Sequence, residues 1–492
     1  MLMDRFRNHN ADADATPVIP NVSPSSVTDK ITGIVLKLGT PLWWWIGFFI
    51  SGFVLLLLGL VLTTVAIEGV GIWAINTPVV WGVAIINLVF WLGIGHAGTL
   101  ISAILLLMRQ EWRASLSRFA EAMTIFALAC AGLFPIFHLG RPWLALWILP
   151  YYDSLMLNPQ WRSPLVWDAF AITTYLTVSA VFWFIGLLPD LASMRDRAEN
   201  RLVKTFYSAL SMGWRGDAMH WERYHKTVFI LAALASPLVI SVHSIVATDF
   251  ATGILAGWHY TIFPPYFVAG AVLSGMALVV LIAIPLRAAL GLHNLITLKH
   301  FDNAGKLMLL TGLMVGFGYL MEFFAPWYTG HADEMVVLES RLTGQYAPYF
   351  YLMIFLNVIA TQMFWFRNVR TNLNMVAALC VFITIGMWLE RFIIVATSMT
   401  AAYLPSMRSY FVPGGWDWLT VIAPFGLFMV LLYMFIRFLP MIPIFETQEL
   451  IEHHKPAQGY MDDEEELGVD DIDDGSGGML QPRPGLLGAG DD

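Results

Sequence analysis

The chain has 492 residues, of which 58% are hydrophobic and 13% are charged, against about 25% charged in a typical soluble protein. Apolar runs of about 20 residues, the length that crosses the ~30 Å hydrocarbon core of a bilayer as a helix, recur along it. This composition excludes an ordinary soluble protein and predicts an all-α polytopic membrane protein, with no nucleic-acid partner. The formal net charge of −9 is misleading, because residues 462–474 alone carry nine acidic residues.

The two ends of the chain differ from its apolar middle. Residues 1–41 are predicted to form a cytoplasmic N-terminal segment, in which 1–29 are polar and are expected to be disordered or bound by a partner. They lack the apolar core of a signal peptide, so we expect them to be retained. Residues 446–492 are predicted to form an acidic, disordered cytoplasmic tail, which leaves 42–445 as the membrane domain.

About ten spanning helices are expected in the membrane domain. Each is an apolar stretch of roughly 20 residues between more polar loops. The predicted ranges are 42–67, 79–108, 119–139, 165–188, 228–247, 265–286, 307–324, 348–366, 375–397 and 419–439.

The orientation follows from the Lys and Arg residues of the connecting loops. The loops after helices two, four, six and eight hold fifteen of these residues, and the opposite loops hold four, namely Arg141, Arg162, Arg341 and Arg408. Positive residues favour the cytoplasmic side of a membrane. The side with fifteen is therefore predicted to be cytoplasmic, and an even number of helices then puts both termini there.

Ionisable side chains inside the predicted helices are the candidate functional residues, because each costs about 2.5–3.5 kcal/mol at mid-bilayer. For Glu121 and Glu322 two interpretations stay open, an interfacial carboxylate or a functional one. His96 is either a hydrogen-bond former between helices or a proton relay. Asp249 is expected just beyond the outer end of the fifth helix. The complete set inside the helices is His96, Glu121, His138, Asp168, His243, Glu322, Glu390 and Arg391.

The segment PIFHLGRPWLALW, residues 135–147, places His138 and Arg141 at the outer end of the third helix. The fourth helix begins on the same side with SPLVWDAF, so Asp168 is expected at a similar depth, about one turn into the membrane. A neutral imidazole and an ionised carboxylate can each accept a proton. The pair fits oxidation of a quinol, whose two hydroxyl protons need acceptors. Arg141 would hold the carboxylate ionised or polarise a quinone carbonyl.

A proton path through the membrane is a further hypothesis. His96 is expected near mid-membrane, Glu121 near the cytoplasmic start of the third helix, and Glu390 and Arg391 side by side in the ninth. From Glu121 to His138 is 17 residues, or about 25 Å of helix, which is too far for direct transfer. Water or hydroxyl groups must intervene, and the nearby sequence offers Thr99, Ser102 and Thr124.

The sequence resembles the polysulfide-reductase-type, or NrfD-like, integral membrane subunits in three features: the ten-helix layout, FHLGRPW at the end of the third helix and SPLVWD at the start of the fourth. Among these subunits it most resembles the ActC quinol-oxidising subunits of bacterial alternative complex III. The resemblance implies two four-helix bundles, about 79–247 and 265–397, with the first and tenth helices flanking them. It also implies a menaquinol or ubiquinol site near the outer face of the first bundle. His138 and Asp168 match the quinol-site positions, and His243 and Asp249 are carried over as further quinol-binding residues.

The same resemblance implies partners in the bacterial cytoplasmic membrane. They are an iron–sulfur subunit on the outer face, haem c subunits that take the electrons onward, and a paralogous NrfD-like membrane subunit, all in contact with membrane lipid. On this chain itself we expect no haem, iron–sulfur cluster or other metal site. Its two cysteines, Cys130 and Cys380, lie singly in apolar runs, and no C-x-x-C-H motif occurs.

Two rival classes of protein share some of these features. A proton-coupled secondary transporter also buries carboxylates and histidines, but it typically breaks paired helices at mid-membrane, whereas Pro237 and Pro285 lie toward the inner parts of their helices. A haem b protein needs two axial histidines at one depth. His96 is predicted to be central and His243 to be nearer the outer end, so the depths of these two disagree.

Overall fold

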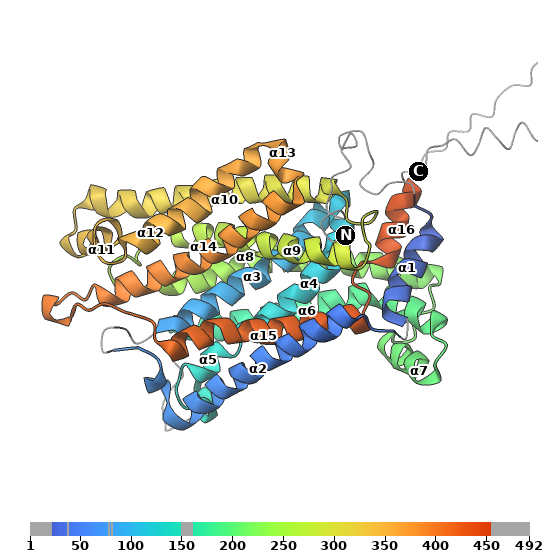
Figure 1. The fold of residues 1–492 in the computed structure, drawn as a ribbon, viewed down its shortest axis with the longest axis horizontal. Coiled ribbons are helices and arrows are strands. Elements are labelled where there is room, and N and C mark those ends of the chain that lie inside the picture. The colour runs from blue at the N-terminus through green and yellow to red at the C-terminus, as the bar shows by residue number, and fades with distance from the viewer. Residues whose placement is uncertain (1–21, 37–38, 77–78, 80–81, 149–160, 454–492) are drawn as a thin grey trace, which may run out of the picture. The chain divides into compact units, whose positions relative to one another are not determined.

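The computed structural model describes residues 22–36, 39–76, 79, 82–148 and 161–453, and every regular element in these ranges is helical (Figure 1). The α-helices are α1 (Pro24–Leu36), α2 (Leu42–Glu68), α3 (Gly82–Leu107), α4 (Ala114–Ala131), α5 (Phe134–Phe137), α6 (Pro164–Arg197), α7 (Arg201–Leu210), α8 (Ala218–Ala251), α9 (Phe263–Ala289), α10 (Leu298–Thr329), α11 (Ala332–Leu342), α12 (Ala347–Ile354), α13 (Arg367–Arg370), α14 (Leu373–Thr400), α15 (Gly415–Phe438) and α16 (Ile444–His453). The 3-10 helices are η2 (Val70–Ile72), η3 (Glu111–Arg113), η4 (Pro142–Ile148), η6 (Ala360–Trp365) and η7 (Pro405–Met407), and η5 (Phe355–Ile359) is a π-helical turn.

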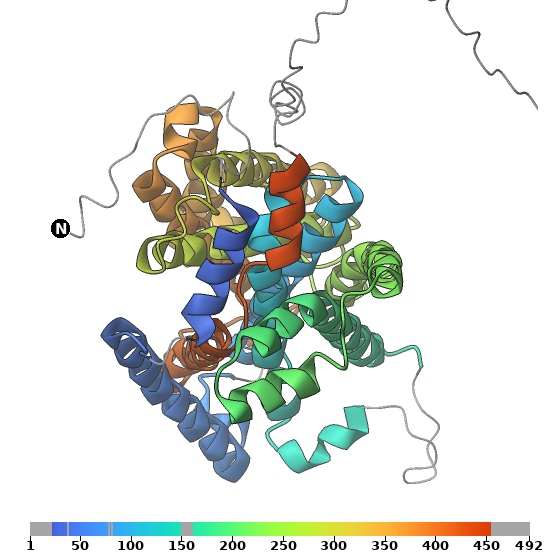
Figure 2. The ribbon, with the colours of Figure 1, turned by 90° about the vertical axis from the view of Figure 1, so that its right-hand side faces the viewer.

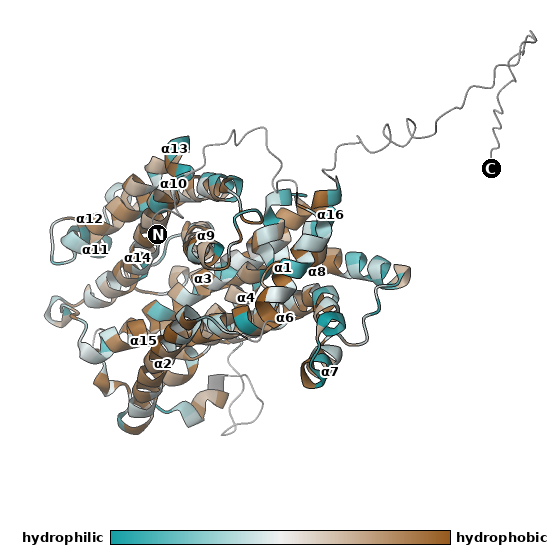
Figure 3. Ribbon diagram, turned by 45° about the vertical axis from the view of Figure 1, so that its right-hand side comes forward, coloured by the Kyte–Doolittle hydropathy of each residue, from teal (hydrophilic) through white to brown (hydrophobic). Residues whose placement is uncertain are grey.

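Ten helices in the described part of the chain are long and apolar enough to cross a membrane, which confirms the predicted all-α polytopic class. Hydrophobic residues dominate α2 and α15, whereas α7 also carries hydrophilic ones (Figure 3). Two spans are not single α-helices. The third consists of η3, α4 and α5, and the eighth passes from α12 through the π-helical turn η5 into the 3-10 helix η6.

Several helices begin earlier than hydropathy predicts, because polar caps hold turns that lie outside the apolar stretch. Helix α8 begins at Ala218, ten residues before the predicted start, where the Asp217 carboxylate accepts a hydrogen bond from the backbone N–H of His220 at 2.8 Å. Helix α10 likewise begins at Leu298 behind Thr297. It ends at Gly330, whose φ of 67° is a left-handed conformation that favours glycine.

Helices α3 and α9 form the centre of the membrane domain. The most apolar stretches of these two helices are 88% and 83% buried, against 22% for α2 and 28% for α6. Helix α3 packs against α4, α8 and α9, while α9 packs against α8, α10 and α14, and α2 lies along α15. Because α3 and α9 contact each other extensively, the division into two four-helix bundles stays a prediction. We call α3, α4, α6 and α8 the first group, and α9, α10, α12 and α14 the second.

Glycine permits the closest helix contacts. At Gly98 of α3, a Cβ atom would lie 2.0 Å from the carbonyl oxygen of Ala120 on α4 and 2.3 Å from the Thr124 hydroxyl. At Gly426 of α15, a Cβ would lie 2.4 Å from the backbone nitrogen of Leu55 on α2. Backbones approach this closely only where one residue has no side chain.

One end of the spans carries three extra helices, α1, α7 and α16, and we call it the α16 end; α6 begins and α8 ends at the opposite end, which we call the α11 end (Figure 1). Helices α1 (blue) and α16 (red) lie side by side (Figure 2). The Gln448 amide donates hydrogen bonds to the Pro24 carbonyl at 2.8 Å and the Thr28 hydroxyl at 2.7 Å. Helical structure thus extends into both predicted terminal segments, from Pro24 and up to His453; residues 1–21 and 454–492 lie outside the described residues.

Candidate functional site

Two carboxyl groups meet at the α11 end. Asp168 lies in the second turn of α6, which begins at Pro164, a favourable first residue of a helix, and Asp249 lies in the last turn of α8. The two side chains are close enough to interact with each other. Each keeps a buried oxygen, Oδ1, that has no partner among the described residues.

The position of Asp249 corrects the sequence-based prediction, which puts this residue beyond the end of its helix. Helix α8 continues to Ala251. Hydroxyl groups bond back along its last turns, from Thr248 to the Ser244 carbonyl at 2.7 Å and from Thr252 to the Thr248 carbonyl at 2.9 Å. The extra turn carries Asp249 across to α6.

His138 lies directly after α5, half-buried, and its Nδ1 is hydrogen-bonded to the Phe134 carbonyl oxygen at 2.9 Å. The chain turns at Gly140, whose φ is 69°, and the exposed Arg141 precedes η4. A Cβ on Gly140 would lie 3.2 Å from the backbone nitrogen of Val70, so this turn packs closely against η2. The described contacts of Asp168 lead to Asp249 and not to His138, and the predicted pairing of His138 with Asp168 stays a prediction.

His96 and His243 contact each other in the interior. Their ring centroids are 4.4 Å apart, so the expectation that they lie at different depths was wrong. Position along a helix gives no measure of how far two helices are shifted or tilted against each other, and here the shift brings α3 and α8 into register. Depth therefore gives no argument against a haem b protein. His96 Nε2 is buried without a partner among the described residues.

A group of hydroxyls extends from His96 toward the α16 end. Tyr175 of α6 stacks on the His96 ring, with centroids 4.8 Å apart, and donates to the Gly95 carbonyl at 2.8 Å. Thr124 donates to the same carbonyl at 2.8 Å. Further contacts link Thr99 with Ser179 at 3.2 Å, Thr99 with Thr124 at 3.4 Å, and Ser102 with Glu121. Of these hydroxyl residues, the sequence singles out Thr99, Ser102 and Thr124, whereas Tyr175 and Ser179 emerge only from the structure.

Polar side chains of the second group extend the contacts that begin at His96 and His243. The Arg391 guanidinium carbon lies 4.7 Å from the centre of the Phe267 ring, and that ring is 6.0 Å from the His243 ring. Arg391 also forms an ion pair with the adjacent Glu390. Glu390 in turn accepts a hydrogen bond from the Tyr319 hydroxyl at 2.5 Å.

Asn357, in the π-helical turn η5, completes this part of the row, because its amide donates to the Tyr319 hydroxyl at 2.7 Å. The amide fits against α14 only at Gly386, where a Cβ would lie 2.1 Å from Asn357 Oδ1. Four candidate residues from the sequence, His96, His243, Glu390 and Arg391, therefore lie in one row that crosses from the first group to the second. Tyr319 and Asn357 are new members; a Tyr and an Asn in apolar runs give no sequence signal strong enough to find them.

Glu322, for which interfacial and functional interpretations were open, is buried at the α11 end of α10. Its carboxylate accepts from Arg341 of α11 at 3.0 Å, and Arg341 also donates to the Thr397 hydroxyl at 3.0 Å. The sequence places Arg341 in a loop, yet its side chain is only 4% exposed. The pair links α10, α11 and α14.

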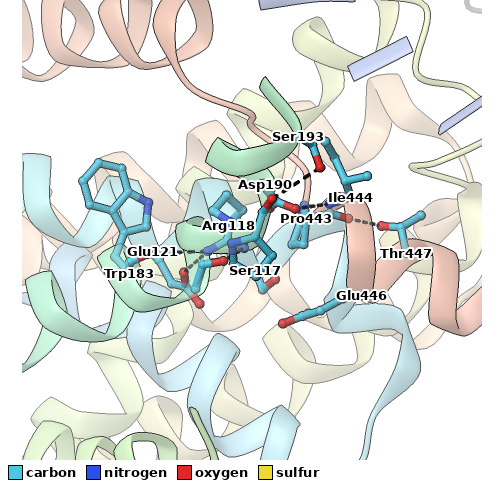
Figure 4. Close-up of polar contacts among 12 residues, drawn as sticks. Ser117, Arg118, Glu121, Trp183, Asp190, Ser193, Pro443, Ile444, Glu446 and Thr447 are labelled. Atoms are coloured by element: carbon cyan, nitrogen blue, oxygen red, sulfur yellow. Dashed lines mark hydrogen bonds and ion pairs between the residues drawn. The ribbon is translucent and has the colours of Figure 1, made fainter. Parts of the chain in front are cut away.

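Glu121 belongs to an ionic cluster at the α16 end (Figure 4). Arg118 lies 3.7 Å from Glu121 and 3.1 Å from Asp190 of α6, and it donates to the Gly186 carbonyl at 2.6 Å. Asp190 accepts from the backbone N–H of Ile444 at 3.1 Å, at the first residue of α16. Glu121 is therefore buried in a network that holds the C-terminal helix, and is not an isolated interfacial carboxylate.

No group of three or more His, Cys, Asp or Glu residues in the described ranges is placed to hold a metal ion. Chemically, the row offers carboxyl, imidazole and hydroxyl groups that can accept and pass protons.

Comparison with known proteins gives a clear result. Residues 73–402 match the family described as "Polysulphide reductase, NrfD", which is well over half of the chain and takes in eight of the ten spans. The chain belongs to the NrfD family. The match runs from before α3 to just after α14, so the whole polar row lies within the NrfD-type region, whereas α1, α2, α15 and α16 lie outside it.

Two curated relatives are similar to this NrfD-type chain over about half of their own length. A putative membrane subunit of a dimethyl sulfoxide reductase, from Halobacterium salinarum, is 25% identical over 238 residues, or 46% of this chain and 50% of the relative. A selenate reductase subunit from Mesobacillus selenatarsenatis is 24% identical over 221 residues, or 43% of this chain and 49% of the relative.

Proposed function

We propose that this chain is the quinol-binding membrane subunit of an electron-transfer complex. It oxidises menaquinol or ubiquinol at the α11 end, which faces the outer side of a bacterial cytoplasmic membrane. Each quinol loses two electrons and two protons and becomes a quinone. The electrons pass to an iron–sulfur partner, because this chain is proposed to hold no redox centre, and the protons leave on the outer side.

The contact between Asp168 and Asp249 carries this proposal. A quinol hydroxyl needs a proton acceptor within hydrogen-bonding reach, and here two half-buried carboxyl groups stand together, each with an oxygen that has no partner among the described residues. His138 is proposed as the second acceptor, and Arg141 as the group that orients the quinone carbonyl. His243 is six residues, or about 9 Å of helix, before Asp249 and is proposed to border the site on its inner side.

Substitution of the carboxyl groups tests the assignment. In the purified complex, Asp168→Asn and Asp249→Asn should each lower quinol oxidation by about 10²-fold or more, the usual contribution of a positioned base. Asp196→Asn is the matched control, because Asp196 lies at the other end of α6 with its side chain 63% exposed, and it should turn over normally. Normal turnover in both site variants, with assembly intact, would remove the carboxyl pair from the mechanism.

We further propose that His96, Glu121, Glu390 and Arg391 carry protons through the membrane domain. The hydroxyl groups that lie between His96 and Glu121 support this proposal, because they divide the distance between the two side chains into shorter steps for a proton. In vesicles, protons released per quinol should fall to the chemical value of two in His96→Phe or Glu121→Gln while electron transfer continues. A wild-type complex that releases only two protons per quinol has no pumping path, and that result would refute this part of the proposal.

The resemblance to ActC suggests an alternative-complex-III type of assembly with haem c subunits and a paralogous membrane subunit. The names of the two relatives support the broader statement that the chain is one subunit of an oxidoreductase. Purification of the tagged chain from its native membrane should yield an iron–sulfur protein with it. A chain that purifies alone and drives solute uptake along a proton gradient would instead be the rival secondary transporter.

A further inference from the structure

Helix α7 lies outside the ten spans and has three distinct faces. It follows α6 after three residues, so that four backbone steps of at most about 14 Å in all separate the end of α6 from the start of α7. The Asn200 side chain caps it by accepting from the backbone N–H of Leu202 at 2.8 Å. Its ten residues are too few to cross a bilayer.

One face of α7 packs onto the protein. Val203, Tyr207 and Leu210 contact a cluster that includes Leu191 of α6 and Val35 of α1. The Tyr207 hydroxyl donates to the Phe438 carbonyl at 2.8 Å, and burial raises the pKa of Tyr207 to about 12, so the group stays a donor at neutral pH. These contacts fix how α7 is rotated about its axis.

A second face presents large apolar side chains away from the protein. Leu202 is 81% exposed and Phe206 is 51% exposed, and Met212, just beyond the helix, is 73% exposed. Because residues 202 and 206 are one turn apart, they form a continuous apolar strip beside the end of a membrane-spanning helix. A strip of this kind is unfavourable in water and favourable in the acyl region of a membrane.

The third face is basic and hydroxylated. Arg201, Lys204, Thr205 and Ser208 line, with Ala209, a shallow surface cavity that is wide open to solvent. Both cations are exposed, and within the described part of the chain neither forms an ion pair, whereas the nearby Arg197 is paired with Asp29 of α1. Two such cations and a hydroxyl around one cavity match the charge and the acceptor oxygens of a phosphate group.

We propose that α7 is an interfacial helix that binds the headgroup of an anionic phospholipid. Arg201, Lys204 and Ser208 hold the phosphate, and Leu202 and Phe206 enter the acyl region beside it. The apolar strip favours a lipid over a free phosphate as the ligand. The cations and the strip lie on neighbouring faces of one short helix, so a single lipid can place its phosphate on one face and its acyl chains beside the other. The site is separate from the carboxyl pair, at the other end of the spans, and goes beyond the proposed function.

The position of α7 in the bilayer can be measured with a single label. Native Cys130 and Cys380 are both fully buried, so a Phe206→Cys variant carries one reactive thiol for a polarity-sensitive dye. In nanodiscs, acyl-chain spin-labelled lipid should quench the dye, and a Leu202→Cys variant should behave in the same way. A Ser208→Cys label faces the cavity and should be quenched less. Absence of quenching at both 202 and 206 would overturn the proposal.

Lipid selectivity is tested on the full chain in its complex. Phosphatidylglycerol should raise the thermal stability of the detergent-purified complex more than phosphatidylcholine does, and soluble glycerol 3-phosphate should not. Each cation near a surface anion is worth about a fivefold change in affinity, so Arg201→Gln/Lys204→Gln should need on the order of thirtyfold more phosphatidylglycerol.

The matched control is Arg215→Gln/Arg223→Gln, which removes the same charge from exposed positions between α7 and the first turns of α8. It should respond to phosphatidylglycerol like the unmodified chain. An equal response in both double variants would show that only net charge matters and would overturn the site. Stabilisation by glycerol 3-phosphate alone would instead make it a soluble-anion site, which also overturns the lipid proposal.

Discussion

Gly98→Ala tests the close contact between α3 and α4, on which the hydrogen bonds of the Thr99 and Thr124 hydroxyls depend. The added Cβ would lie 2.0 Å from the Ala120 carbonyl oxygen, about 1.4 Å short of an ordinary contact, so α3 and α4 must separate by roughly that distance. Two buried hydrogen bonds cross the same interface, from the Thr99 backbone N–H to the Thr124 hydroxyl at 3.1 Å and from that hydroxyl to Gly95 at 2.8 Å. A shift of this size breaks both.

The size of the effect follows from these contacts. Overpacking costs about 1–3 kcal/mol and each lost buried hydrogen bond about 1 kcal/mol, so the free energy of unfolding should fall by about 3–5 kcal/mol. Gly59→Ala on α2 is the matched control, since a Cβ there meets nothing within 4 Å. Chemical unfolding in detergent, followed by near-ultraviolet circular dichroism, measures both variants. If Gly98→Ala and Gly59→Ala unfold alike, α3 and α4 are not as close as described.

Three further predictions address other parts of the fold. Glu322→Gln or Arg341→Met alone should lower the free energy of unfolding by about 3–5 kcal/mol, because each leaves a buried charge without its partner, and the double variant should recover much of that loss; additive losses would contradict the pairing. Tyr319→Phe should destabilise the protein by about 1–3 kcal/mol more than Tyr328→Phe, because the Tyr319 hydroxyl has two buried partners whereas the Tyr328 side chain is 75% exposed; equal losses in the two variants would contradict this. A reporter fused behind α16 should be cytoplasmic and one inserted after Gly330 should be external; the opposite result would place the carboxyl pair on the inner side.

The sequence predicts the spans well, because each needs about 20 apolar residues and hydropathy measures that property directly. It misses α1, α7 and α16, whose apolar residues cover only one side of a short helix. For α7 a signal is present, since Asn200 is a good cap and residues 203, 207 and 210 have helical spacing. The early start of α8 is also missed, because a cap at Asp217 lies outside any apolar run.

For the candidate site, the sequence predicts which end a residue occupies but not which residues touch. Topology alone puts Asp168 and Asp249 at the same end, and the structure adds their contact across 81 residues of sequence. The contact of His96 with His243 could not be predicted, because it depends on the tilt and offset of α3 and α8. The count of Lys and Arg residues in the loops similarly treats Arg341 as an exposed loop cation. Hydropathy does not predict that α11 folds back and pairs Arg341 with Glu322.

The π-helical turn η5 makes the contact between Asn357 and Tyr319 depend on the number of residues in this segment. A π-helical turn closes its hydrogen bonds over five residues where an α-helix uses four, so it holds one additional residue. Removing one residue between 355 and 359 would close this turn as an α-helix, in which the flanking parts of the span keep their rotation and the side chains within the turn change position. Asn357 would then leave Tyr319, although no side chain had been exchanged. A one-residue deletion along this segment would therefore break the contact even where Asn357 and Tyr319 themselves are unchanged.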